Sequence, residues 1–375
     1  MLRFALSLPA LVLLSACGAG EIRALYSADE RRVRIAGIGA YGIFDPSFAP
    51  DPAGGIWMSL SSVDPSYHRP VKHPHTVTTA LAKSEDGGRT WRFTDRVNVA
   101  RDVLQGKRFA EVDPETPFNW SHEVSTLVHD PRADASARWR LFWHRYALIR
   151  GKRRFEYGWI AHKAAGTPGE LARAPETKLF VARGYKQTSD AVSGAPRIRL
   201  HELAPDVRHC LFLTEPSALV RGDALFLSLY CVTGRGKGRI ILLAERAGRW
   251  SFAGTFLENR REAKTLSKQY PPFQGFSAPE LTRRAGKDYL IVTPTTPGSL
   301  PNYRGCLVME IADLKTARLA RRGAAPEVVR FISGGERHHR GACAYNEKVA
   351  GGIYLSRAYP RAARVFRVFS TGVEP

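Results

Sequence analysis

Residues 214–230 of this sequence read Thr-Glu-Pro-Ser-Ala-Leu-Val-Arg-Gly-Asp-Ala-Leu-Phe-Leu-Ser-Leu-Tyr. Two short runs rich in apolar and aromatic residues flank an Arg-Gly-Asp triplet of the kind that forms tight turns. The pattern predicts a β-hairpin. Its first strand begins with a polar residue, Glu215, which is followed by proline.

The same unit, a strand with a polar or small start followed by a turn and an aromatic-rich strand, occurs four more times. These units span residues 45–60, 120–143, 277–292 and 341–356, and candidate outer strands follow at 239–243 and 306–310. Clean helical periodicity is almost absent, so the expected fold class is all-β. Five hairpins with trailing strands predict a five-bladed β-propeller in one domain. A large two-sheet sandwich, or two domains, is the alternative.

In a radial array, the first strand of each blade lies beside the central channel, so polar residues at the strand starts can meet at one mouth. This geometry gathers Asp45, Glu123, Glu215 and Glu280. Each acid taken alone could equally form a turn or pair with one of the many arginines. Their convergence is what indicates a site.

The N-terminus has the pattern of an export signal. A basic start is followed by an apolar run over residues 4–14, which is too short to span a bilayer. The segment Leu14-Ser15-Ala16-Cys17 resembles the lipobox, and this resemblance implies that Cys17 is the acylated, palmitate-bearing first residue of the mature protein. An ordinary secretory signal with a chance cysteine is the alternative.

The expected organisation has three parts: a lipoprotein signal peptide over 1–16, a lipidated N-terminus and linker over 17–35, and a β-propeller domain over 36–375. The protein is then anchored by lipid in the cell envelope. If the cell is Gram-negative, the expected location is the outer membrane, because Gly18 stands where an inner-membrane retention signal has aspartate.

Four cysteines lie in the predicted domain: Cys210, Cys231, Cys306 and Cys343. The oxidising compartment of an exported protein permits disulfides. Cys210 and Cys231 flank one predicted hairpin and are the better candidate pair, although neighbouring buried thiols fit almost as well. The cysteine spacing is not that of a metal site.

The chain is strongly basic, with 56 Lys and Arg against 35 Asp and Glu and a formal net charge of +21. A field of this sign attracts anionic partners such as acidic polysaccharides or lipid head groups. Positive charge scattered over a solvated surface is an equally good interpretation. Nucleic acid is not an expected partner of an exported protein, and a monomer is expected.

The stretch Ser84-Glu85-Asp86-Gly87-Gly88-Arg89-Thr90-Trp91 resembles the Asp box of sialidases and related propellers. This resemblance implies a tight turn formed by the Asp carboxylate and Gly backbone, with Trp91 packed between sheets. The expected role is in folding rather than catalysis.

The channel motifs resemble those of glycoside hydrolases with five-bladed propellers, notably family 43 and more distantly family 32, over most of residues 40–369. The motifs are, in chain order, Asp45-Pro46-Ser47, Trp120-Ser121-His122-Glu123-Val124, Glu215-Pro216-Ser217 and Arg337-His338-His339-Arg340-Gly341. The resemblance implies that Asp45 is the catalytic base and that Glu215 is the general acid. It also implies that Glu123 tunes the pKa of the acid and orients the substrate.

This chain departs from the family pattern in three places. Glu123 stands in place of aspartate, His122 stands in place of proline, and Ser277-Ala278-Pro279-Glu280 adds another acidic motif. Glu280 could therefore exchange roles with Glu123 or Glu215. The Asp box is more typical of sialidase-like chains, but their arginine triad is not traceable here, so sialidase is a minor interpretation.

The expected substrate-binding residues are Trp120, His122, Glu280, His339 and Arg340. Trp120 could stack on a sugar ring, although tryptophans in propellers more often pack between blades. His339 is expected at the channel, where many family members hold calcium nearby, and the alternative is a solvated loop. No cofactor is expected apart from such a structural calcium in the channel.

Glycosidic cleavage requires two carboxyl groups, because the leaving oxygen must receive a proton while water or a carboxylate attacks the anomeric carbon. We therefore expect a cell-envelope glycosidase with inverting chemistry that acts on a carbohydrate, either anionic or arabinose-containing. A non-catalytic glycan-binding lipoprotein and a scaffold for envelope assembly are the alternatives.

Overall fold

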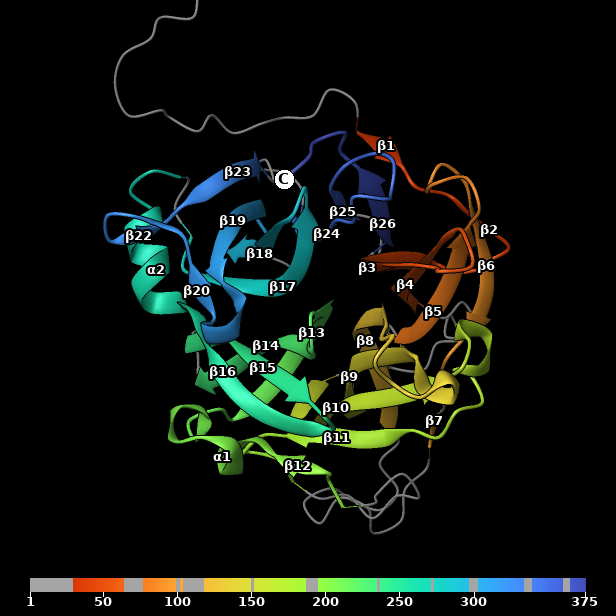
Figure 1. The fold of residues 1–375 in the computed structure, drawn as a ribbon, viewed down its shortest axis with the longest axis horizontal. Helices are drawn as coiled ribbons and strands as arrows, with labels where there is room; N and C mark the ends of the chain where they lie inside the picture. The colour runs from red at the N-terminus through yellow and green to blue at the C-terminus, as the bar shows by residue number, and fades with distance from the viewer. Residues whose placement is uncertain are drawn as a thin grey trace, which may run out of the picture.

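The computed structural model describes residues 30–63, 77–98, 102–103, 118–149, 152–186, 195–234, 237–270, 273–296, 303–333, 339–359 and 365–375. Five sheets, antiparallel except at one outer strand pair in each of the first two blades, are arranged around a central axis (Figure 1). The predicted all-β fold and the five-bladed β-propeller are confirmed. The predicted lipidation site, Cys17, lies outside the described residues, as does His338.

The first three blades follow the chain order. Blade one contains β3 (Gly42–Pro50), β4 (Ile56–Val63), β5 (Val77–Ser84) and β6 (Trp91–Arg96), with β2 (Ile35–Ala36) parallel to β6. Blade two contains β7 (Asp102–Val103), β8 (Phe118–His129), β9 (Trp139–Ile149), β10 (Lys152–Ala165), β11 (Thr177–Val181) and β12 (Ile198–Arg199). Blade three contains β13 (Phe212–Arg221), β14 (Ala224–Gly234), β15 (Lys237–Arg246) and β16 (Arg249–Glu258).

The last two blades complete the ring. Blade four contains β17 (Gly275–Arg284), β18 (Lys287–Thr295), β19 (Gly305–Asp313), β20 (Arg318–Leu319) and β23 (Val328–Ser333), beside the small hairpin of β21 (Arg321–Arg322) and β22 (Ala325–Pro326). Blade five contains β24 (His339–Ala344), β25 (Tyr354–Tyr359), β26 (Val365–Ser370) and β1 (Arg31–Arg32). Two short α-helices, α1 (Leu200–Leu203) and α2 (Asn259–Leu266), follow β12 and β16.

The ring is closed by the N-terminal part of the described chain. Arg31 and Arg32 pair with Ser370 and Phe369 of β26, so the first strand supplies the outer edge of the last blade. This strand lies in a stretch that the sequence assigns to the linker. Its pairing places it within the propeller, because the edge of an incomplete last sheet can be satisfied by any extended segment nearby.

Each of the five predicted hairpins forms the two inner strands of one blade. The first strands β3, β8, β13, β17 and β24 lie around the centre in Figure 1, and each contacts the next around the ring. The predicted acids lie on these innermost strands, so the fold places them near the axis.

Every innermost strand is interrupted at one equivalent position by a bulge. The ladder between the first and second strand of each blade shifts register there. One residue within each bulge has a left-handed backbone, and these residues are Asp45, Val124, Glu215, Ala278 and Ala342. In three blades proline follows, as Pro46, Pro216 and Pro279, because a bulge tolerates a residue without an N–H group.

The bulges are secured from the preceding blade. The backbone N–H groups of Asp45, Val124 and Ala342 donate to the hydroxyls of Ser356, Ser61 and Thr293, over 2.8, 2.9 and 2.8 Å. The N–H group of Ala278 donates instead to the Glu215 carboxylate, over 2.7 Å. Because a buried N–H without a partner is costly, these polar side chains fix four of the five bulges and join neighbouring blades.

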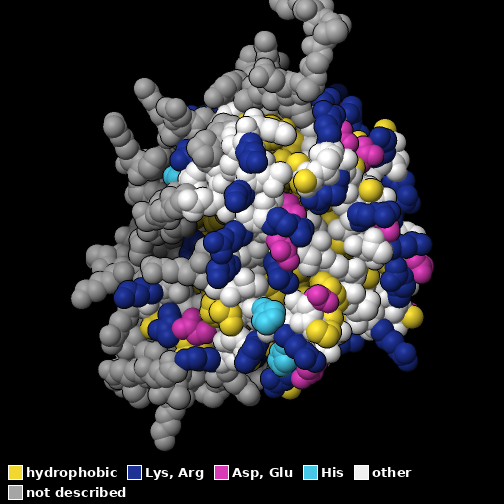
Figure 2. Space-filling model, turned by 90° about the vertical axis from the view of Figure 1, so that its left-hand side faces the viewer, with side chains coloured by type: hydrophobic (Ala, Val, Ile, Leu, Met, Phe, Trp, Pro, Cys, Tyr) yellow, Lys and Arg dark blue, Asp and Glu magenta, His cyan; other side chains and the backbone are white. Residues whose placement is uncertain are grey.

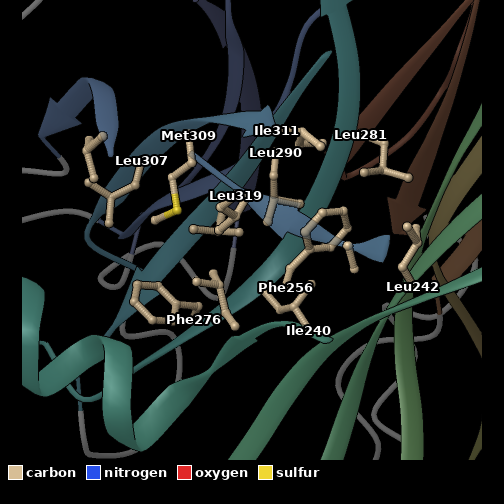
Figure 3. Close-up of a cluster of buried hydrophobic side chains, with 14 of the residues drawn as sticks. Ile240, Leu242, Phe256, Phe276, Leu281, Leu290, Leu307, Met309, Ile311 and Leu319 are labelled. Carbon is tan, nitrogen blue, oxygen red and sulfur yellow. The ribbon is translucent and has the colours of Figure 1, made fainter. Parts of the chain in front are cut away.

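The apolar core consists of separate clusters between consecutive blades. Figure 3 shows the cluster between blades three and four, where Ile240, Leu242 and Phe256 pack with Leu290, Leu307 and Met309. Equivalent clusters fill the other four junctions. Since both faces of each sheet are covered by neighbouring sheets, the middle strands are apolar along most of their length rather than alternating.

The turn between β5 and β6 is closed by its own side chains. The Asp86 carboxylate accepts hydrogen bonds from the Ser84 and Thr90 hydroxyls, both 2.7 Å, and from the backbone N–H of Thr90, 2.9 Å. These hydrogen bonds lower the pKa of Asp86, and the two from Thr90 have the largest effect. The indole of Trp91 donates to Gly88 and is buried against Phe48. The turn therefore belongs to the structural framework.

Two disulfides cross-link the propeller. Cys210–Cys231, the predicted pair, ties the entry of β13 to β14 within blade three. Cys306–Cys343 joins β19 to β24 and so links blade four to blade five. The second pair was not predicted, because the two cysteines come from different repeat units that meet only when the ring closes.

Positive charge is dispersed over the face drawn in Figure 2. Lys and Arg side chains cover much of that face, with Asp and Glu side chains between them. This distribution favours the interpretation of scattered charge for that face. Among the described residues, no helix has the length and apolar character needed to cross a membrane.

Removal of the inter-blade disulfide should destabilise the protein. We expect the Cys306→Ala, Cys343→Ala double variant to lose about 4 kcal/mol of unfolding free energy, and the corresponding Cys210, Cys231 variant about 3 kcal/mol, from the lengths of the closed loops. Urea unfolding of the three proteins under oxidising conditions measures both values. Free thiols at these positions in the denatured, unreduced protein would contradict the pairing.

Candidate active site

Two of the acids predicted to be catalytic occupy equivalent left-handed positions. Asp45 has φ 51° in the bulge of β3, and Glu215 has φ 56° in the bulge of β13. A bulge redirects a side chain out of the regular alternation of a strand. A left-handed backbone is unfavourable for non-glycine residues, and such strain is concentrated at functional sites. Both acids therefore occupy positions held by the surrounding structure.

Asp45 is buried and anchored on two sides. Its Oδ2 accepts a hydrogen bond of 3.1 Å from the Ser61 hydroxyl, and its backbone N–H donates to Ser356. The pKa of Asp45 is raised well above its ordinary value, first by burial and then by the charge of Glu123. The Ser61 hydrogen bond opposes this effect, and Glu215 adds to it.

Glu123 lies one residue before the left-handed position of β8. Its Oε1 accepts hydrogen bonds from the hydroxyl of Tyr146, at 2.5 Å, and from that of Ser121, at 3.3 Å. The guanidinium Nη2 of Arg153 lies 3.7 Å from the same oxygen. The carboxylate of Glu123 is therefore held in place by the second and third strands of its own blade.

Glu215 is half-buried and is held from blade four. Its Oε2 accepts the 2.7 Å hydrogen bond from the N–H of Ala278. Burial is the main cause that raises the pKa of Glu215 to about 7, opposed by the Ala278 hydrogen bond and increased by the charge of Glu123. Glu215 in turn contributes, after burial, to raising the pKa of Tyr230 to about 12.

The structure thus brings Asp45, Glu123 and Glu215 within electrostatic reach of one another. Asp45 responds to both of the other acids, and Glu215 responds to Glu123. Carboxyl groups that share one site cannot all ionise easily, because like charges disfavour the charged form. This arrangement can supply one protonated and one ionised carboxyl group at the same pH.

Sequence reasoning missed Arg153 and Tyr303, which also belong to this group. Arg153 lowers the pKa of both Asp45 and Glu215. The pKa of Tyr303 is raised by burial first, and then by Glu215 and Asp45. Gly341 allows Tyr303 to approach, since a Cβ there would lie 2.9 Å from that of Tyr303. Neither residue has a sequence signal, because each arrives from outside the repeated inner strand.

Glu280 does not occupy the position that the sequence suggested. Ala278 is the left-handed residue of blade four, so Glu280 aligns with Ser47 and Ser217, two residues later. Its carboxyl oxygen Oε2 accepts a 2.6 Å hydrogen bond from the Ser217 hydroxyl. Burial raises the pKa of Glu280 to about 8, and the Ser217 hydrogen bond opposes this shift. This placement favours a structural role at the junction of blades three and four.

Trp120 and His122 are enclosed within blade two and its neighbours. Trp120 belongs to the cluster between blades one and two, with the Arg145 guanidinium 4.4 Å from its ring centroid. His122 is 2 % exposed, and its Nδ1 accepts a 3.0 Å hydrogen bond from the Trp143 indole. Burial lowers the pKa of His122. These positions favour the packing alternative over sugar contact.

His339 and Arg340 begin the innermost strand of blade five. Both are half-buried, and Arg340 forms an ion pair with Glu30, which also lies 3.9 Å from Arg357. The described parts of the chain contain no group of three or more His, Cys, Asp or Glu side chains placed to hold a metal ion. A calcium ion in the channel stays a prediction.

Comparisons with known proteins show the fold. No family model matches the sequence, and no curated protein matches it. A GH32 β-fructofuranosidase of Bombyx mori, BmSUC1, superposes with a TM-score of 0.50 and 11% identity, over 88% of this chain and 59% of that chain. An exo-β-1,3-galactanase from Clostridium thermocellum, 1,3Gal43A, superposes with a TM-score of 0.50 and 10% identity, over 90% and 60%.

The fold is that of the five-bladed β-propeller glycoside hydrolases. This chain spans about three fifths of the length of each of these two proteins (59% and 60%). At such low identity the likeness concerns the backbone arrangement, and the chemistry must be argued from the residues themselves.

The position of Glu280 leads to a test by pH. A carboxyl group whose pKa is raised from 4.5 to about 8 by folding stabilises the protein fully below the lower value, and this stability is lost as the pH rises through the higher one. The Glu280→Gln variant keeps an acceptor for Ser217 without an ionisable group. We therefore expect the variant to have a higher unfolding free energy than the wild type at about pH 9. The difference between variant and wild type should be larger at about pH 9 than at about pH 5, on the order of a few kcal/mol.

Urea unfolding at the two pH values measures this difference. Glu202→Gln is the matched control, because the Glu202 side chain is 64% exposed and its substitution should add little pH dependence. If Glu280→Gln changed the unfolding free energy by the same amount at both pH values, folding would not raise the pKa of Glu280.

Proposed function

We propose that this protein is a glycoside hydrolase in which Glu215 protonates the leaving oxygen and Asp45 activates a water molecule at the anomeric carbon. The observation that carries the proposal is the proximity of three acids on neighbouring innermost strands, where Glu123 acts on both Asp45 and Glu215 and Glu215 acts on Asp45. Acid–base cleavage of a glycosidic bond needs two carboxyl groups in opposite protonation states.

Glu215 fits the role of the acid. Its pKa of about 7 keeps a substantial protonated fraction near neutral pH. One of its oxygens, Oε2, is occupied by the Ala278 N–H group. The proton is therefore carried by the other oxygen, Oε1, which is the atom that delivers it to the leaving group.

Asp45 fits the role of the base. Burial and the charge of Glu123 raise the pKa of Asp45, and the Ser61 hydroxyl, which donates to its Oδ2, and the charge of Arg153 oppose this rise. Glu123 raises the pKa of both partners and is itself fixed by Tyr146 and Ser121. Glu123 thereby adds to burial, which is the main cause that keeps Glu215 protonated, in the way that a neighbouring charge usually does.

The setting of this reaction is also part of the proposal. The lipobox-like sequence ending at Cys17 supports a lipid-anchored protein of the cell envelope that acts on poly- or oligosaccharide outside the cytoplasm. The chemistry assigned to the carboxyl groups uses water as the second substrate and requires no organic cofactor.

Replacing the acid should have an effect that depends on the leaving group. We expect Glu215→Gln to lower kcat by about 10²–10⁴-fold on an oligosaccharide, and by much less on an aryl glycoside whose phenolate leaves without protonation. The fall in wild-type activity above about pH 7, where Glu215 loses its proton, should also disappear in the variant. Sugar release from a polysaccharide panel, followed by kinetics on the best oligosaccharide and its aryl analogue, measures both effects.

Asp45→Asn is the matched comparison, because loss of the base should slow both types of substrate equally. An unchanged Glu215→Gln enzyme would rule out Glu215 as the acid. Absence of sugar release by the wild type, with glycan binding intact in wild type and Glu215→Gln, would instead identify a glycan-binding module.

The stereochemistry of the product tests the role of Asp45. If Asp45 activates water directly, the first sugar released has the inverted anomeric configuration, which proton NMR detects before mutarotation. A first product with retained configuration would make Asp45 a nucleophile instead.

A further inference from the structure

Arg153 reaches the acids of the candidate site from outside the innermost strands. It lies near the start of β10, the third strand of blade two, opposite Leu148 of β9. Its guanidinium passes 5.9 Å from the Tyr146 ring centroid and ends 3.7 Å from Oε1 of Glu123. The side chain thereby brings a positive charge to the acids from outside the innermost strands.

The pairing between Arg153 and Glu123 leaves most of the guanidinium available. The separation of 3.7 Å is longer than a hydrogen bond, and Oε1 of Glu123 already accepts from Tyr146 and Ser121. Apart from the strand pairing of its backbone with Leu148, Arg153 makes no hydrogen bond through its guanidinium to another described residue. Its side chain is 41% exposed, against 11% for Glu123. A guanidinium has five N–H donors, so several remain for a ligand.

The rest of the site would repel a negatively charged sugar. Asp45 and Glu123 present carboxyl groups to the same space, and Arg153 is the cation whose charge acts on both Asp45 and Glu215. A guanidinium with open donors beside acids is suited to hold a carboxylate in two parallel hydrogen bonds.

We propose that the site accepts a carboxylate-bearing sugar, a uronosyl residue, and that Arg153 is the specificity-determining residue that binds its carboxylate. This inference rests on the proposed glycosidase function and names the substrate class of the same site. The net charge of +21 agrees with it, since a positive field raises the local concentration of an acidic polymer.

The test compares each acidic glycan with its own neutral derivative. Polygalacturonan, alginate and glucuronoxylan oligosaccharides are each used before and after chemical reduction of the uronate carboxyl to the alcohol, which preserves the linkages. We expect wild-type kcat/KM to favour the acidic member of the cleaved pair, and Arg153→Gln to reduce this preference about 10- to 100-fold.

Arg154→Gln is the matched control on the same strand, because Arg154 pairs with Glu156. The control should keep the preference for the acidic glycan, which separates the effect of Arg153 from that of net charge. A purely structural role of Arg153 would lower activity on both members of a pair equally and leave their ratio unchanged. That result, or a wild type that cleaves the neutral member as well as the acidic one, would overturn the proposal.

Failure of the proposed catalysis is distinguishable from failure of this inference. If no glycan is cleaved, calorimetric binding of the same pairs to wild type, Arg153→Gln and Arg154→Gln tests the recognition alone. A preference for the acidic member that only Arg153→Gln loses supports the uronate site without the hydrolase. Equal affinities for both members, or no binding of any acidic member, overturn the uronate site.

Discussion

The left-handed bulge in each innermost strand is the constraint on which the rest of the structure depends. A regular strand would alternate its side chains between the two faces of the blade and would direct none of them along the channel. The bulge breaks this alternation at one equivalent position in all five blades. The N–H group that it frees in four of the blades is bonded by a side chain of the blade before. Local backbone strain, assembly of the ring and orientation of the acids are therefore parts of one arrangement.

Glu215 shows how closely the fold and the candidate chemistry are connected. In blades one, two and five a serine or threonine hydroxyl bonds the N–H group of the left-handed residue, whereas in blade four the Glu215 carboxylate does so. The general-acid candidate is thus also one of the connections between blades three and four. Its orientation is fixed before any substrate arrives, which is the preorganisation that acid catalysis requires.

The sequence was sufficient for the repeat and for three of its acids. The five hairpins and the acids at 45, 123 and 215 follow from alternation, turn residues and equivalent strand starts. The position of Glu280 was also readable in principle, because acid precedes proline in Asp45-Pro46 and Glu215-Pro216 but follows it in Pro279-Glu280. Arg153 and Tyr303 were not readable, since they lie outside the repeated unit, Arg153 on the third strand of blade two and Tyr303 beside Gly341.

The overall charge and the local electrostatics of the site act in opposite directions. A chain with a net charge of +21 should stabilise carboxylates and lower their pKa values throughout. The pKa values of Asp45, Glu215 and Glu280 are nevertheless raised, with burial as the largest cause for each. Distant surface charges are screened by water and salt, whereas loss of hydration acts directly on a buried carboxyl group. Protonation of Glu215 therefore depends mainly on the burial of its carboxyl group in the bulge, and the dispersed arginines can attract a substrate without disabling the acid.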